Sequence, residues 1–209
     1  MFPDEPRFIL PLEFGDKVTL SWDTEGPLAG PFASPINSEP RISRSARRFL
    51  DKKLTQLESY LPFDFVFKKD NRNADIRISV SDGPITVQGV TLGPLQVITG
   101  IIVPGESSHQ LVLAQEPGSF WVNTTYKMTA LHEVGHALGL THPGTGGADP
   151  AYTTADTIMS YNVTDPSPFY RPLDLQRLQQ LWGWNKGDLD PITGLKYKTS
   201  QGGTAYIPL

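Results

Sequence analysis

The chain contains no cysteine among its 209 residues, so disulfide bonds and cysteine metal ligands are excluded. It also lacks a long apolar run, since no stretch approaches the roughly 20 apolar residues of a membrane-spanning helix. The first residues, MFPDEPRFILPLEF, place acids before any base and hold no apolar core of signal-peptide length. The chain is therefore expected to be cytosolic, exported without a cleaved signal, or part of a longer chain.

A large excess of charge is also missing. The 18 basic and 22 acidic residues give a net charge of -4, so a nucleic-acid partner is not expected. Hydrophobic residues make up 38% and charged residues 19%, as in an ordinary globular chain long enough to bury a core. Six basic residues gather between positions 41 and 53, which fits either a solvated helix face or a patch for an acidic partner.

The hydrophobic pattern predicts a mixture of strands and helices. A strand with alternating apolar residues is expected at 17–22 and a helix at 38–61, where apolar residues recur at steps of three or four. Two more helices are predicted at 124–138 and 174–182. Further strands are predicted at 63–68, 75–80, 95–103, 109–114 and 119–123.

Three of the four histidines lie in the short run LHEVGHALGLTHP. His132 and His136 are four residues apart, so a helix places both imidazoles on one face, where they can reach one ion. Gly139 tolerates a left-handed backbone that ends the helix, and the chain can then turn back. His142 can thus supply a third nitrogen. The spacing predicts a zinc site with three nitrogen ligands and an open fourth position for water.

Glu133 follows the first of these ligands directly. Its carboxylate can face the bound water instead of the metal and can act as the general base. A purely structural site has no need of this carboxylate, so Glu133 favours catalysis. The fourth histidine, His109, is expected on a loop or a strand surface, away from the site.

The run HEVGHALGLTH resembles the pattern H-E-x-x-H-x-x-G-x-x-H of the metzincin zinc peptidases, whose Met-turn has a counterpart in TIMSY at 157–161. Within the metzincins, the chain is most similar to the serralysin branch. The similarity lies in Pro143-Gly144 after the third histidine, in the sequence of the turn and in the later run DLQRLQQLWG. The glycine-rich calcium-binding repeats of that branch are absent, so calcium binding is not supported.

The resemblance implies an α+β, zincin-like metzincin fold. It would have a twisted mixed five-stranded sheet with an active-site helix in an N-terminal lobe, 1–143. An irregular C-terminal lobe, 144–209, would hold the Met-turn and a final helix, and the two lobes would form one catalytic domain. Met159 would form an apolar floor beneath the zinc. Tyr161 would lie near the metal and stabilise the oxyanion.

These features together predict a secreted zinc endopeptidase with one catalytic zinc, acting as a monomer on extended protein substrates through a zinc-bound water. The substrate would add a strand to a sheet edge, at either 95–103 or 109–114. The segment 162–172 would shape a specificity pocket. The alternative is a catalytically silent zinc-binding structural module of a larger assembly. A third reading is a zymogen in which a carboxylate such as Asp16 blocks the zinc.

Overall fold

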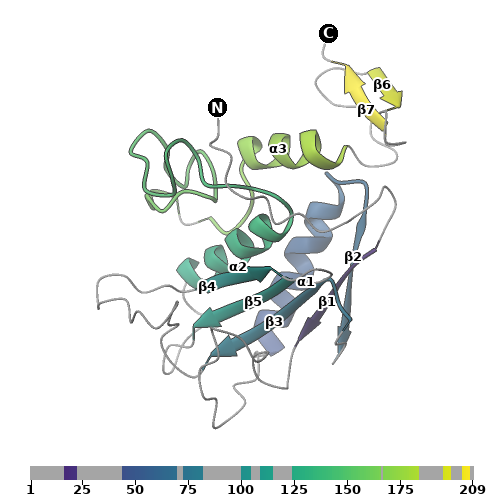
Figure 1. Ribbon diagram of the computed structural model, residues 1–209, viewed down its shortest axis with the longest axis vertical. Helices are drawn as coiled ribbons and strands as arrows, with labels where there is room; N and C mark the ends of the chain where they lie inside the picture. The colour runs from purple at the N-terminus through teal and green to yellow at the C-terminus, as the bar shows by residue number, and fades with distance from the viewer. Residues whose placement is uncertain are drawn as a thin grey trace.

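The computed structural model describes residues 17–22, 44–69, 73–81, 100–104, 109–114, 124–165, 167–183, 195–198 and 204–207. Within these residues, five strands form one sheet and three helices accompany it (Figure 1). The sheet strands are β1 (Lys17–Trp22), β2 (Asp64–Lys69), β3 (Ile76–Ser81), β4 (Gly100–Pro104) and β5 (His109–Ala114). The helices are α1 (Arg44–Glu58), α2 (Thr124–Ala137) and α3 (Pro172–Trp182). The chain is therefore α+β, as the resemblance to the metzincins implies.

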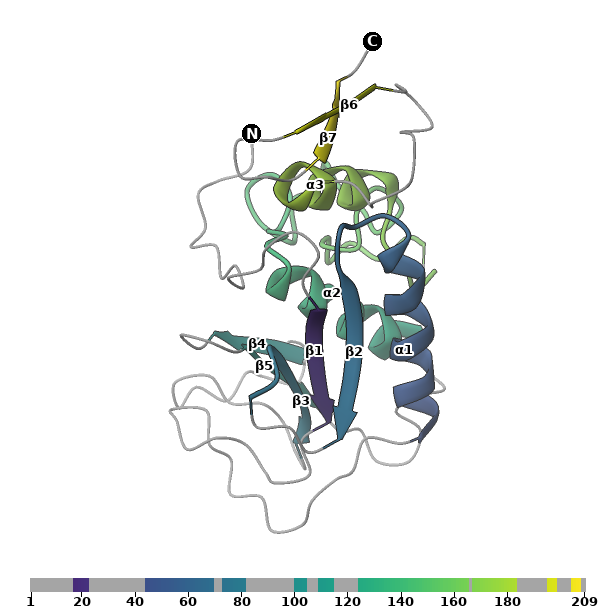
Figure 2. The same ribbon diagram turned by 90° about the vertical axis from the view of Figure 1, so that its right-hand side faces the viewer.

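The sheet has the strand order β2-β1-β3-β5-β4. The pairs β1–β2, β1–β3 and β3–β5 are parallel, whereas β4 runs antiparallel to β5 at the edge. Helix α1 contacts β2, and helix α2 contacts β4 and β5. Figures 1 and 2 show both helices on the same face of the sheet, with α3 beyond one end of it. This arrangement brings α2 close to the antiparallel edge strand.

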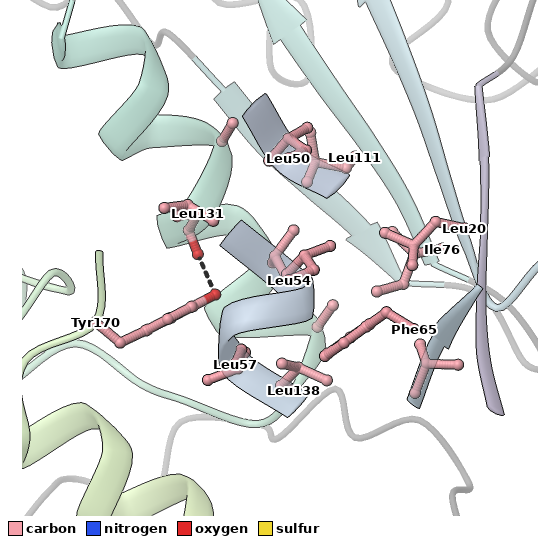
Figure 3. Packing of buried hydrophobic residues seen from close by; sticks show 14 of the residues in the cluster. Leu20, Leu50, Leu54, Leu57, Phe65, Ile76, Leu111, Leu131, Leu138 and Tyr170 are labelled. Carbon is pink, nitrogen blue, oxygen red and sulfur yellow. Dashed lines mark hydrogen bonds between the residues drawn. The ribbon is translucent and has the colours of Figure 1, made fainter. Parts of the chain in front are cut away.

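Helix α1 forms because its apolar side chains share one face. Ala46, Leu50, Leu54 and Leu57 recur at steps of three or four, and all of them are buried. Full burial of each leucine contributes about 1.5–3 kcal/mol to folding. Figure 3 shows these leucines between the sheet and α2. The other labelled members of this core include Leu20, Phe65, Ile76, Leu111, Leu131 and Leu138.

The predicted end of the first helix is wrong by three residues, because α1 ends at Glu58. The backbone of Tyr60 donates to Leu57 in a tighter turn, and the Ser59 hydroxyl donates to the Gln56 carbonyl. These bonds use the carbonyl groups that would otherwise continue the helix. The predicted start of this helix, at 38, lies outside the described residues.

The predicted start of the last helix is also wrong, because α3 begins two residues earlier, at Pro172. Proline suits the first turn of a helix, where its missing N–H is not needed. The Asp174 carboxylate accepts a hydrogen bond from the backbone N–H of Arg171 at 2.8 Å. This bond caps the helix at Arg171, so Asp174 lies in the first turn and does not begin the helix. Gly183, with φ 88°, ends this helix at the predicted place.

The other boundaries differ little. Strands β1 and β5 have their predicted bounds, β2 and β3 are shifted by one residue, and α2 ends one residue early. Residues 95–99 and 119–123, predicted as strand, lie outside the described residues. The hairpin of β6 (Leu195–Lys198) and β7 (Thr204–Ile207) was not predicted. In the described part of the chain, no helix has the length and apolar character needed to cross a membrane.

Candidate metal centre

Helix α2 carries two of the predicted ligands one turn apart. The ring centroids of His132 and His136 are 4.7 Å apart. The helix then closes in a Schellman motif, in which Gly139 has φ 89°. Its backbone N–H donates to His136 at 2.9 Å, and that of Leu140 donates to Gly135 at 2.9 Å. Glycine adopts this backbone conformation without strain, so Gly139 accounts for the position of the turn.

The turn brings the third histidine back against the first two. The Nε2 atom of His142 lies 3.2 Å from that of His136 and 3.3 Å from that of His132. The three ligand atoms all lie within 4.8 Å of one another. A tetrahedral zinc ion with bonds of about 2.0–2.1 Å separates its nitrogen ligands by about 3.3–3.4 Å. The three imidazoles therefore fit a single zinc ion.

The protonation of two imidazoles also suits a metal. The Nδ1 atom of His132 lies 2.9 Å from the carbonyl oxygen of Ile158, and that of His136 lies 2.9 Å from that of Leu140. A carbonyl can only accept, so Nδ1 donates and Nε2 keeps its lone pair when the ring is neutral. Burial lowers the pKa of His132 well below its usual value and that of His136 to about 4, with neighbouring histidines adding to the effect. Both rings are neutral near pH 7.

Glu133 is buried beside the first histidine, with 7% of its surface exposed. A carboxylate in such a place is costly unless it has polar partners. Tyr161 also lies at the cluster. Its hydroxyl is 2.8 Å from Nε2 of His142, and the residue is 58% exposed. One buried carboxylate and one accessible phenol therefore accompany the three imidazoles.

Met159 is 1% exposed and packs against helix α2. A Cβ atom at Gly135 would lie 3.0 Å from its sulfur atom, so the helix has no side chain where the methionine approaches. The hydroxyl of Tyr170 reaches the same helix and donates to the carbonyl of Leu131 at 2.7 Å (Figure 3). The segment after the third ligand is thus packed closely onto the ligand-bearing helix.

Asp174 has a role that its predicted place, as the first residue of a helix, did not indicate. The buried carboxylate accepts hydrogen bonds from the Thr157 hydroxyl and, at 2.9 Å, from the Ile158 backbone N–H. Burial raises the pKa of this carboxyl, and its hydrogen-bond donors act in the opposite direction. An acid near the start of a helix indicates a helix cap. It does not indicate hydrogen bonds to a distant segment such as 157–158.

The segment between His142 and Met159 is held by side chains of the residues that follow Met159. The Ser160 hydroxyl donates to the Tyr152 carbonyl at 2.9 Å. The Asn162 amide donates to the carbonyls of Asp149 and Tyr152 at 2.8 and 2.9 Å. This amide therefore serves an internal structural purpose.

A buried arginine holds the segment that follows. The guanidinium of Arg171 donates to the Thr154 carbonyl at 2.6 Å and to the Asp165 carbonyl at 3.2 Å. It also forms an ion pair with the Asp165 carboxylate at 3.2 Å. The Arg171 side chain thus ties Thr154 and Asp165 together, next to the start of α3.

Comparison with known proteins places these residues in a family. The family model of the matrixins, a family of peptidases, matches residues 35–165. No curated protein matches the chain. The matched range includes the three histidines and the turn at 157–161, and it supports the metzincin-type resemblance. Because the match covers more than half of the 209 residues, the chain belongs to the matrixin family of zinc metalloendopeptidases.

Proposed function

We propose that this protein is a zinc-dependent endopeptidase that cleaves protein substrates bound in an extended conformation. One observation carries the proposal: Nε2 of His142 lies 3.2 and 3.3 Å from Nε2 of His136 and His132, next to the buried residue Glu133. Three nitrogen ligands leave a fourth position open, which is typical of catalytic zinc sites and not of structural ones.

His132, His136 and His142 would hold the zinc ion. Zinc supplies Lewis-acid chemistry, because it polarises a carbonyl group and lowers the pKa of water. Glu133 takes the proton of the attacking water and later delivers it to the leaving amine. Tyr161 donates a hydrogen bond to the oxygen that gains negative charge in the tetrahedral transition state. Met159 provides the apolar floor, in agreement with its 1% exposure.

The sheet order favours one of the two candidate substrate edges. Strand β5 lies between β3 and β4, so its backbone is paired on both sides. Strand β4 stands at the end of the described sheet and contacts helix α2. An extended peptide can add to such an edge through main-chain hydrogen bonds. We therefore assign substrate binding to β4, which overlaps the predicted run 95–103.

The site is proposed to be of the serralysin type. This assignment is supported by Tyr161, whose hydroxyl is 2.8 Å from Nε2 of His142.

Two lobes are proposed, at 1–143 and 144–209, with a specificity pocket shaped by 162–172. The fastening of this segment by Arg171 suits a pocket of fixed shape. An extracellular, monomeric enzyme is proposed, as matrixins are commonly extracellular. Calcium binding is not part of the proposal.

The test is cleavage of an unfolded protein by the purified, zinc-loaded chain, compared with Glu133→Ala and with a chelator-treated sample. We expect zinc content to be unchanged in Glu133→Ala and the cleavage rate to fall by about 10²–10⁴-fold, the usual contribution of a general base. Retention of more than a few per cent of the rate would exclude Glu133 as the base. A zinc-loaded wild type that cleaves nothing would favour the catalytically silent structural module.

A further inference from the structure

Gly147 lies against the ring of Tyr161. A Cβ atom placed on Gly147 would be 2.6 Å from Cδ2 and from Cε2 of that ring and 2.8 Å from Cζ. Carbon atoms in favourable contact are about 3.5–4.0 Å apart. Even one methyl group at this position would therefore force a displacement of roughly 1 Å.

The backbone conformation of Gly147 does not itself require glycine. Gly144 and Gly146, earlier in the same loop, have positive φ angles of 59° and 142°, which side-chain-bearing residues rarely adopt. Gly147 is not among the glycines with positive φ. What excludes a side chain at Gly147 is the space taken by the Tyr161 ring.

The backbone under the ring cannot retreat easily. The N–H of Tyr161 donates to the Gly147 carbonyl at 2.7 Å, which ties the two residues together. The Ser160 hydroxyl lies 3.4 Å from the same carbonyl, and the Asn162 amide holds Asp149 at 2.8 Å. Gly147 is buried, whereas Tyr161 is 58% exposed. A clash would therefore be relieved by movement of the ring.

The position of this ring determines where the phenol hydroxyl lies. The ring centroids of Tyr161 and His142 are 4.8 Å apart, and the hydroxyl is 2.8 Å from Nε2. A misplacement of about 1 Å in a catalytic group can reduce a rate by roughly 10²-fold. The absence of a side chain at Gly147 thus sets the distance between the Tyr161 hydroxyl and the three histidines.

We propose that Gly147 is a positioning residue for Tyr161: by having no side chain, it lets the ring lie close against the loop with its hydroxyl at the metal centre. This inference rests on the proposed function, since it assigns to Gly147 a part in the same reaction. It also states a requirement on the loop between the third histidine and the Met-turn: the residue that supports the tyrosine ring must be glycine.

The test compares four variants of the full, zinc-loaded chain: Gly147→Ala, Tyr161→Phe, the double variant, and Ala148→Ser as a matched control. Ala148 is exposed, so Ala148→Ser adds one atom to the same loop away from the ring. The readouts are kcat and KM, the melting temperature, and the nuclear Overhauser effect between the rings of Tyr161 and His142. The last readout is independent of catalysis.

We expect Gly147→Ala to weaken the ring-to-ring signal and to lower kcat by about tenfold or more, with little change in KM. Tyr161→Phe should lower kcat by about 10²–10³-fold, as for loss of one oxyanion donor. The double variant should be no slower than Tyr161→Phe, because the hydroxyl is already absent. Ala148→Ser should behave as wild type in all readouts.

Three results would overturn the inference. The first is an unchanged ring-to-ring signal in Gly147→Ala. The second is a weakened signal with wild-type kcat, which would separate the ring position from the reaction. The third is a double variant much slower than Tyr161→Phe, which would mean that Gly147 acts through something other than the hydroxyl. A wild type without peptidase activity would refute the proposed function, while the ring-to-ring signal would still test the positioning.

Discussion

The carboxylate of Asp174 and the imidazole of His132 are joined through the backbone of a single residue, Ile158. The N–H of Ile158 donates to Asp174 at 2.9 Å, and the Ile158 carbonyl oxygen lies 2.9 Å from Nδ1 of His132. A carboxylate on α3 thereby orients His132, the first candidate zinc ligand on α2, through the turn between them. Groups that orient metal ligands in this way commonly contribute 10- to 100-fold in metal affinity or activity.

Asp174→Asn is therefore expected to weaken zinc binding by about 10- to 100-fold. It should also destabilise the fold by about 1–3 kcal/mol, since the amide cannot accept all three hydrogen bonds. Zinc titration against a competing chelator and thermal unfolding would measure the two effects. Asp165→Asn is the matched control. The Asp165 side chain is 45% exposed, so its ion pair with Arg171 contributes only about 0–1 kcal/mol to stability. Equal effects of the two substitutions would contradict the relay through Ile158.

The three histidines are expected to bind one zinc ion per chain. A ligand that binds only the folded state stabilises it by about 2.7 kcal/mol at 100 times its dissociation constant. Removal of zinc should therefore lower the melting temperature, and added zinc should restore it. In His142→Ala the response to zinc should be much smaller, because one of the three converging nitrogens is gone. Elemental analysis that finds no zinc in the wild type would refute the ligand set.

The stability of the chain should fall above pH 10 because of Tyr170. Burial raises the pKa of this phenol well above its usual value, and Asp174 adds to the effect. The unfolded chain loses the same proton at about pH 10, so this contribution is complete below pH 10 and is lost as the pH rises. The loss should approach about 1.4 kcal/mol per pH unit.

Tyr170→Phe isolates this titration from those of other tyrosines. At pH 8 the variant should be less stable by about 0.5–1.5 kcal/mol, since it lacks the hydrogen bond to Leu131. The difference from wild type should shrink as the pH rises above 10. Urea unfolding at several pH values would measure it, and a constant difference across that range would argue against a buried phenol.

The fold and the site should respond differently to a cavity in the core. Leu54 is fully buried, so Leu54→Ala should destabilise the chain by about 2–5 kcal/mol. Thr55 is exposed on the same helix, and Thr55→Ala should change stability by no more than about 0.5 kcal/mol. Below its melting temperature, Leu54→Ala should keep its zinc content and its kcat. A large loss of kcat in the folded variant would show that the core is coupled to the site.

Local signals in the sequence were sufficient to bring the histidines together. His132 and His136 share a helix face, and Gly139 closes that helix through bonds within six residues. The positions of the main strands also followed from local patterns. Each of these features depends on residues that are neighbours along the chain, and for that reason they could be predicted.

Features that depend on distant residues could not be predicted in this way. The bond between Asp174 and Ile158 spans 16 residues, and the contact between Gly147 and Tyr161 arises from the path of a loop. Local periodicity also carries no information on the order of the strands. The sequence therefore predicts two candidate substrate-binding edges, and only the pairing of β4 with β5 distinguishes them. The short strands β6 and β7, of four residues each, carry too little pattern to be detected.

The Schellman turn at Gly139 has a consequence for how the protein takes up its metal. The turn and the hydrogen bond between His136 and Leu140 are built from the chain alone, and the Asn162 amide holds the loop beyond at Asp149. The third ligand is therefore pre-organised, and zinc uptake need not be accompanied by folding of the loop. We expect the ion to exchange at rates set by ligand chemistry, so that a stripped enzyme regains its metal without passing through an unfolded state.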